Sequence, residues 1–217
     1  MYRHQVSAFL SIPVFILTAF VVPQTISAAT PATDRASIVE TKMALRDLWV
    51  EHIFWIRSYV LAVHANDEVQ HEAAETEVLA NAKALAGTIT PFYGQAASDA
   101  LLKLLAGHWS AVRDYNTATL AKSKSGQDKA VENLTSNARE IAKFLSGANP
   151  NLPEEAVYSL LLGHGGHHVT QIKQIASRDF QDEAATWHAM RKHMLVISDA
   201  IADALVKQFP ERFQDRI

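Results

Sequence analysis

Three histidines lie within the apolar stripes of three separate predicted helices: His52, His108 and His164. An imidazole on the apolar face of an amphipathic helix points at the core rather than at water. Each of the three is also near the middle of its predicted helix, and mid-helix positions in a bundle lie at similar depth. We therefore expect the three imidazoles to meet between helices, where they could bind Zn, Cu or Fe and leave a coordination position open.

Two further histidines extend this candidate ligand set. His168 follows His164 by four residues, so both lie on one face of a helix. His188 lies beside the apolar stripe of the last predicted helix and is expected to border the site. Met190 and Met194 lie on that stripe; one of them could be a soft ligand for copper, but core filling is their expected role.

Glycines are concentrated beside two of these histidines. The chain has 8 glycines. Gly107 precedes His108, and Gly163, Gly165 and Gly166 flank His164. A glycine inside a helix costs about 1 kcal/mol relative to alanine. The pattern therefore indicates a need for space for a ligand, a close helix approach or a local kink. A break in the helix at Gly165–Gly166 is the alternative.

Other chemistries find weaker support in the sequence. Glu68 and His71 match one Glu-x-x-His motif of di-iron bundles, but that fold needs two such motifs and further glutamates. A hemerythrin-like ligand pattern fits poorly because His193 stands where its final acid would be. The chain has no cysteine, which excludes thiolate ligands and thiol redox chemistry. No phosphate loop or nucleophile motif is present, so no catalytic residue is predicted and enzyme activity stays open.

Periodic apolar residues predict an all-α protein, an up-and-down bundle of four long helices plus one or two peripheral helices. No stretch alternates as a strand would, and no internal repeat is expected. The polar second segment is expected to be peripheral. The predicted helical segments are 35–66, 68–86, 95–123, 128–146, 153–177 and 180–208.

The first 29 residues are typical of a signal peptide. Arg3 is the only basic Lys or Arg residue there, an apolar run follows, and Ser27-Ala28-Ala29 supplies small residues for cleavage. We expect residues 30–217 to form a single helical domain in the periplasm or outside the cell. An uncleaved segment is the alternative, and it would be the chain's only attachment to a membrane. The formal net charge of −3 and the lack of a basic run make nucleic acid an unsuitable partner.

A pattern in the first helical segment resembles the opening of an uncharacterised family of small bacterial helical-bundle proteins. The residues Leu48 to Arg57 read Leu-Trp-x-x-His-x-x-Trp-x-Arg. The resemblance continues through Pro91–Gly94, His108, 137–145, Asn149-Pro150 and His164, and covers residues 42–205. The family pattern falls on His52, Trp55, Arg57, Tyr93, His108, Asn137 and His164, but not on His168 or His188. It implies the fold and the site, and no reaction.

The leading hypothesis is an exported metal-binding bundle for storage, sensing or oxygen and redox chemistry. Arg57, Tyr93 and Asn137 would then support the ligands or position an anion. The alternative is a metal-free bundle whose histidines, with Arg57 and Trp55, line a pocket for a small anionic molecule. Convergence of the imidazole nitrogens on one point would favour a metal ion. A purely structural envelope protein with incidental histidines is the third possibility.

Overall fold

The computed structural model describes residues 36–214. The predicted signal segment, residues 1–29, lies outside the described residues. Within the described part, no helix is both long enough and apolar enough to cross a bilayer.

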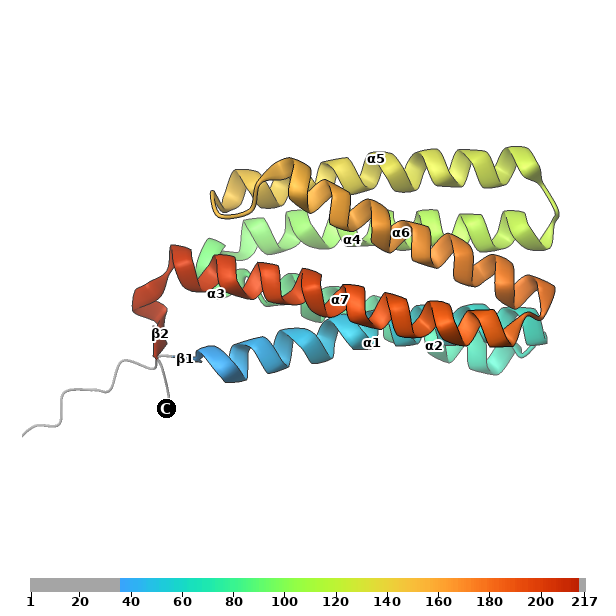
Figure 1. Ribbon diagram of the computed structural model, residues 1–217, viewed down its shortest axis with the longest axis horizontal. Helices are drawn as coiled ribbons and strands as arrows, with labels where there is room; N and C mark the ends of the chain where they lie inside the picture. Colours follow the sequence, from blue (N-terminus) through green and yellow to red (C-terminus); the bar gives the residue numbers. More distant parts are fainter. Residues whose placement is uncertain (1–35, 215–217) are drawn as a thin grey trace, which may run out of the picture. The chain divides into compact units, whose positions relative to one another are not determined.

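The prediction of an all-α bundle is confirmed (Figure 1). Within residues 36–214 the long helices number six, however, and not four, and have 20 to 29 residues each. The second helix is a full member of the bundle because its Ala74, Val78, Ala82 and Leu85 are buried, although its outer face is polar. The long helices are α1 (Ile38–Ala65), α2 (Glu68–Gly87), α4 (Gln95–Leu120), α5 (Lys124–Ala148), α6 (Glu154–Ser177) and α7 (Phe180–Gln208).

Short elements complete the chain. Helix α3 (Thr90–Tyr93) is a single turn between the first two hairpins, and a short helix, η1 (Pro210–Arg212), follows α7. The strands β1 (Ala36–Ser37) and β2 (Phe213–Gln214) pair in parallel, so the two ends of the described chain are joined. Loops between the long helices are short, which makes neighbouring helices antiparallel.

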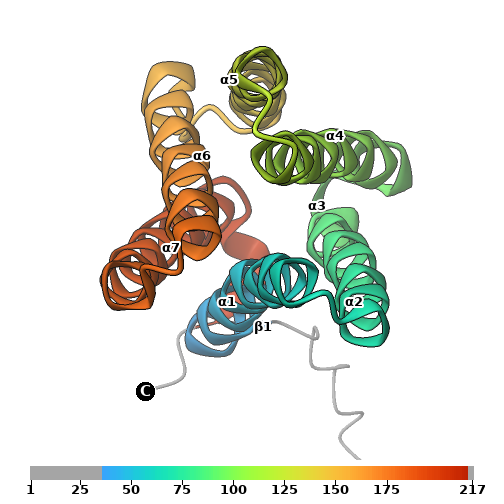
Figure 2. The same cartoon turned by 90° about the vertical axis from the view of Figure 1, so that its right-hand side faces the viewer.

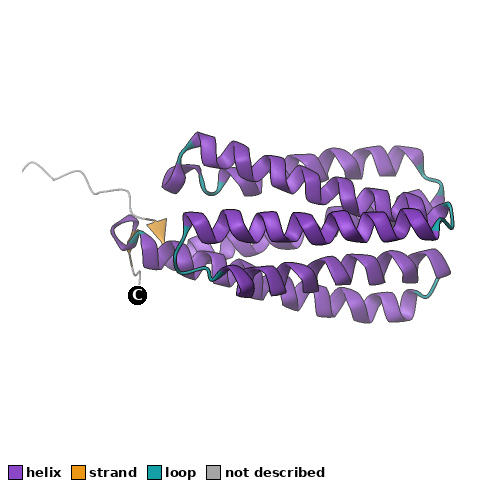
Figure 3. Cartoon of the chain, turned by 90° about the horizontal axis from the view of Figure 1, so that it is seen from above, coloured by secondary structure: helices purple, strands orange, loops and turns teal. Residues whose placement is uncertain are grey.

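The six helices form three hairpins, α1–α2, α4–α5 and α6–α7, arranged around a common centre (Figure 2). Helices α1, α4 and α6 run in one direction, and their partners return in the other (Figures 1 and 3). Helix α1 also packs on α7, so the last hairpin closes the ring against the first. The bundle is thus a cyclic set of three equivalent units.

The turns of the three hairpins show that these units repeat at an interval of 56 residues. The left-handed residues Asn66, Lys122 and Arg178 are spaced at this interval, with φ of 56°, 52° and 62°. The next residue in each unit caps the returning helix by accepting a bond from the backbone N–H three residues on; these caps are Asp67, Ser123 and Asp179. The expectation that the chain has no internal repeat is therefore wrong.

The repeat is hard to see in the sequence because the three units share geometry and burial more than residue identity. The left-handed turn position holds an asparagine, a lysine and an arginine in the three units. At many equivalent core positions the residue type differs and only the burial is the same. Ile56, Val112 and His168 are equivalent by number and all buried, yet one of the three is a histidine. Apolar periodicity predicts each helix but does not compare one helix with another.

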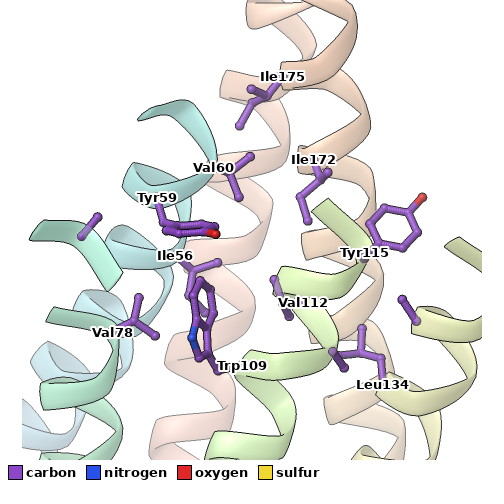
Figure 4. Packing of buried hydrophobic residues seen from close by; sticks show 13 residues of the cluster. Ile56, Tyr59, Val60, Val78, Trp109, Val112, Tyr115, Leu134, Ile172 and Ile175 are labelled. Atoms are coloured by element: carbon purple, nitrogen blue, oxygen red, sulfur yellow. The ribbon is translucent and has the colours of Figure 1, made fainter. Parts of the chain in front are cut away.

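The largest apolar cluster fills the turn end of the bundle (Figure 4). Tyr59 and Trp109 meet edge to face with ring centroids 4.8 Å apart, and Val60, Val112 and Ile172 close the space around them. Side chains from all three hairpins contribute, so the cluster holds the hairpins together at one end. Burial of such side chains supplies about 1.5–3 kcal/mol each.

We expect Lys122→Gly to raise the free energy of unfolding by about 0.5–1 kcal/mol. A left-handed conformation costs an L-residue other than glycine about 1–2 kcal/mol, and the greater freedom of glycine in the unfolded chain offsets part of the gain. Asn66→Gly is the matched control with a smaller gain, because asparagine adopts this conformation readily. Urea unfolding measures both, and a loss of stability in Lys122→Gly would contradict the strain argument.

Candidate metal centre

The three histidines selected from the sequence occupy the same position in the three hairpins. His52, His108 and His164 are 56 residues apart and lie near the middle of α1, α4 and α6. Their ring centroids form a nearly equilateral triangle with sides of 5.2, 5.5 and 5.8 Å. The pseudo-threefold arrangement therefore brings the three imidazoles to one level at the centre of the bundle.

His168 is the fourth member of this cluster. It lies one turn after His164 on α6, and their rings have centroids 4.5 Å apart with Nε2 atoms separated by 3.2 Å. The equivalent residues of the other hairpins are Ile56 and Val112, so only the third hairpin supplies a second imidazole. The four side chains each offer a ring nitrogen, and these nitrogens all lie within 4.8 Å of one another.

These separations suit a single ion. Four atoms within 4.8 Å of one another have a common centre no more than about 3 Å from each. Ligand bonds of about 2.0–2.1 Å to one ion would place neighbouring nitrogens about 3–3.4 Å apart, which the His164–His168 pair already satisfies. A contraction of less than about 1 Å per ring would bring the other nitrogens into coordination distance.

Burial keeps all four imidazoles neutral. Between 1% and 6% of each residue is exposed to solvent. Burial lowers the pKa of His52 to about 3, with a smaller effect from the nearby His108. Burial also lowers the pKa of His108 to about 4, although the neighbouring Asn137 side chain raises it. The pKa values of His164 and His168 are depressed far below the usual range by burial first and by the other histidines second.

Neutral imidazoles are the form that binds metals, and here they have few other partners. The buried Nδ1 of His52, Nε2 of His108 and Nδ1 of His164 have no hydrogen-bond partner. A buried polar atom without a partner costs about 1–3 kcal/mol, so three in one cluster need a physical reason. An ion bound to the rings would give one nitrogen of each ring a partner; for His164 this is either Nδ1 or the Nε2 that faces His168.

A second set of polar contacts fixes the backbone one turn before each triangle histidine. Asn81 Nδ2 donates to the Leu48 carbonyl and Asn137 Nδ2 to the Leu104 carbonyl, both at 2.9 Å. His193 Nε2 donates to the equivalent carbonyl of Leu160 at 2.8 Å. Each pair is separated by 33 residues, so all three hairpins use the same contact.

The glycines beside the histidines make room for packing between helices. A Cβ on Gly107 would lie 3.1 Å from Asn137 Nδ2, and one on Gly163 would lie 3.2 Å from His193 Cε1. A Cβ on Gly165 would lie 2.9 Å from Leu134, whereas Gly166 has open space around it. Helix α6 continues through these residues, so the alternative of a helix break at Gly165–Gly166 is wrong.

Of the four residues expected to support the site, only Asn137 is placed beside a cluster histidine, as its effect on the His108 pKa shows. Trp55 packs against the large apolar cluster and meets Phe54 edge to face. Tyr93 lies near the end of α7, where its hydroxyl donates to Gln208 at 2.6 Å and accepts from Asn149 at 3.1 Å.

Arg57 has a structural role between α1 and α7. Its guanidinium forms two hydrogen bonds to the Glu183 carboxylate, of 2.6 and 2.7 Å, and Gln171 donates a third bond to that carboxylate. The Glu183 side chain is 1% exposed, and Arg57 holds its pKa down against the opposing effect of burial. The guanidinium is therefore committed to Glu183 and does not position an anion as expected.

The structure does not bring His188 to the cluster. Its side chain is exposed on α7, and it does not belong to the group of converging ring nitrogens. His193 borders the site instead, through its bond beside Gly163. The signal for this was present in the sequence, since His193 stands 56 residues after Asn137 and 112 after Asn81. Met190 and Met194 are fully buried in an apolar cluster with Ile53 and Ile197.

No family model, curated protein or solved structure matches this chain.

We expect Arg57→Ala to lower the free energy of unfolding by roughly 3 kcal/mol, because it leaves the buried Glu183 carboxylate with only Gln171 as a partner. Arg46→Ala is the matched control. Arg46 makes the same two-bond contact to Asp199 between the same helices, but 44% of its side chain is exposed. Its loss should cost much less than the loss of Arg57, because solvent-exposed ion pairs contribute little to stability. Equal losses in urea unfolding would contradict this assignment.

We expect the metal-free protein to lose stability as the pH falls below about 6.5. Unfolded histidines take up protons near that pH, whereas folded His52 and His108 resist until about 3 and about 4. The unfolded state therefore binds more protons in this window, and each such group lowers the free energy of unfolding by up to about 1.4 kcal/mol per pH unit.

Unfolding in urea from about pH 7.5 to about pH 4.5 measures this loss. The double variant His52→Gln/His108→Gln, which cannot titrate at these positions, should show a shallower slope. A pH-independent stability of the parent chain would show that the cluster is not dry.

Proposed function

We propose that this chain is an exported helical-bundle protein that binds one transition-metal ion through His52, His108, His164 and His168. The observation that carries the proposal is the convergence of four buried imidazole nitrogens within 4.8 Å. Imidazole suits Zn, Cu and Fe, whereas Ca and Mg prefer oxygen ligands. The predicted signal segment supports a location in the periplasm or outside the cell.

The ligand set constrains the charge of the site. The converging group holds four histidines and no carboxylate. The buried carboxylate of Glu183 is bonded to Arg57 and is therefore not free to balance the charge of an ion. A divalent ion would therefore keep its full charge in a medium of low dielectric constant, which is costly without an anion. Binding of Cu(I), or of a divalent ion together with hydroxide, satisfies this constraint best.

The geometry favours the metal-binding hypothesis over a metal-free pocket for an anion. The cavity beside the triangle is lined by apolar side chains and three of the histidines, with no charged group among them. Arg57 is bonded to Glu183, and burial keeps the histidines neutral. No positive charge is therefore available there to attract an anionic ligand. Storage, sensing, and oxygen or redox chemistry are the roles such a metal site could serve.

Metal content of the purified protein tests the proposal. We expect about one ion of Zn, Cu or Fe per chain by mass spectrometry, or stoichiometric uptake of one of these ions after chelation. His168→Val should weaken binding at least about ten-fold, or ~1.4 kcal/mol. Valine occupies the equivalent position in the second hairpin, at Val112, so the fold should accept this substitution.

Two histidine variants serve as controls for this test. His167→Ala changes the neighbour of a ligand, and His188→Ala changes an exposed histidine outside the cluster. Both should keep the metal affinity of the parent chain. Failure of the parent chain to retain or take up Zn, Cu or Fe would reject the proposal, as would equal losses in the His168→Val and control variants.

A further inference from the structure

A cavity adjoins the histidine triangle on the pseudo-threefold axis of the bundle. His52, His108 and His164 all line it, and His168 does not. Most of its wall comes from residues at equivalent positions of the three hairpins. Two such sets are Trp49, Leu105 and Leu161, and Leu85, Ile141 and Ile197.

The cavity and His168 lie on opposite sides of the triangle. Trp49, Leu105 and Leu161 each precede a triangle histidine by three residues, one turn toward the start of α1, α4 and α6. His168 follows His164 by four residues, one turn toward the other end. Because these three helices run in the same direction, an ion in the triangle would be capped by His168 on one side and face the cavity on the other.

The size and lining of the cavity define what can enter it. The cavity has a volume of about 50 Å³, and its wall carries no charged side chain. An engineered apolar cavity of about 150 Å³ stays dry and binds benzene or xenon. A space of one third of that volume excludes a six-membered ring but admits a molecule of two or three atoms. Apolar walls also disfavour a charged or strongly polar occupant.

We propose that this cavity admits a small uncharged molecule, of the class of dioxygen, nitric oxide and carbon monoxide, to an open coordination position of the ion. This inference rests on the proposed metal site. Four nitrogen ligands with His168 on one side leave the cavity side of the ion without a protein donor. The polar side chains that line the cavity are the three histidines, Thr88 and Trp49, whose indole Nε1 has no hydrogen-bond partner. A gas molecule entering it is thus directed to the ion.

The test uses the full protein in two forms. The metal-free form is exposed to xenon and followed by ¹²⁹Xe NMR, which reports the cavity independently of any metal. Forms loaded anaerobically with Fe(II) or with Cu(I) are exposed to nitric oxide and to carbon monoxide and followed by electron paramagnetic resonance and infrared spectroscopy, respectively. We expect xenon binding in the first form and a bound-gas signal from at least one loaded form.

A pair of substitutions ties the signal to the cavity. Leu105→Phe should fill the cavity, and an aromatic side chain is already accepted at the equivalent Trp49. Ile175→Phe enlarges a buried side chain of the large apolar cluster, three turns away from His164 on α6. We expect Leu105→Phe to keep the metal but lower xenon and gas affinity at least about ten-fold. Ile175→Phe should lower neither.

The outcomes separate this inference from the proposed function. A chain that binds metal but gives no bound-gas signal in either loaded form overturns the inference and leaves the metal site intact. Gas binding that is the same in Leu105→Phe and in the parent also overturns it. A chain that binds no metal overturns both proposals, and xenon binding would then mark the cavity as a metal-free apolar site.

Discussion

Four imidazoles that stay neutral in an apolar interior impose the main constraint on this structure. Water is excluded from their nitrogens, so each ring must find a partner inside the protein or leave a polar atom unsatisfied. Three of these nitrogens have none within the described residues. Around them, the amides of Asn81 and Asn137 donate to backbone carbonyls, and the Asn137 side chain also raises the pKa of His108. His164 and His168 face each other through their Nε2 atoms.

The three hairpins explain how this arrangement is built. Each contributes one triangle histidine, one left-handed turn and one side chain bonded to a carbonyl 33 residues away. Because the three hairpins are equivalent, the same local structure places one histidine from each at one level. The departures from the repeat carry the specific properties of the site. Position 168 is a histidine where the other two hairpins have isoleucine and valine, and position 193 is a histidine where both have asparagine.

Much of this could be derived from the sequence alone, because it depends on local patterns. Apolar periodicity predicted the six helical segments, stripe position predicted His52, His108 and His164, and four-residue spacing from His164 predicted His168. The arrangement of the helices could not be derived in this way, since a polar outer face made α2 look peripheral although its inner face is buried. Arg57 and His188 were misplaced for a similar reason. Whether a side chain on the edge of a stripe meets Glu183 or solvent depends on the neighbouring helix, which periodicity does not identify.

The parallel pair of β1 and β2 has a consequence for the order in which the chain assembles. Each hairpin consists of contacts between residues close in sequence, which form quickly, whereas the Arg57–Glu183 contact spans 126 residues and the strand pair joins the two ends. The three hairpins can therefore form one after another, and closure of the ring must await α7 and β2. The histidine triangle is completed only when α6 packs against α1 and α4, so the histidine cluster forms only after the first two hairpins are available.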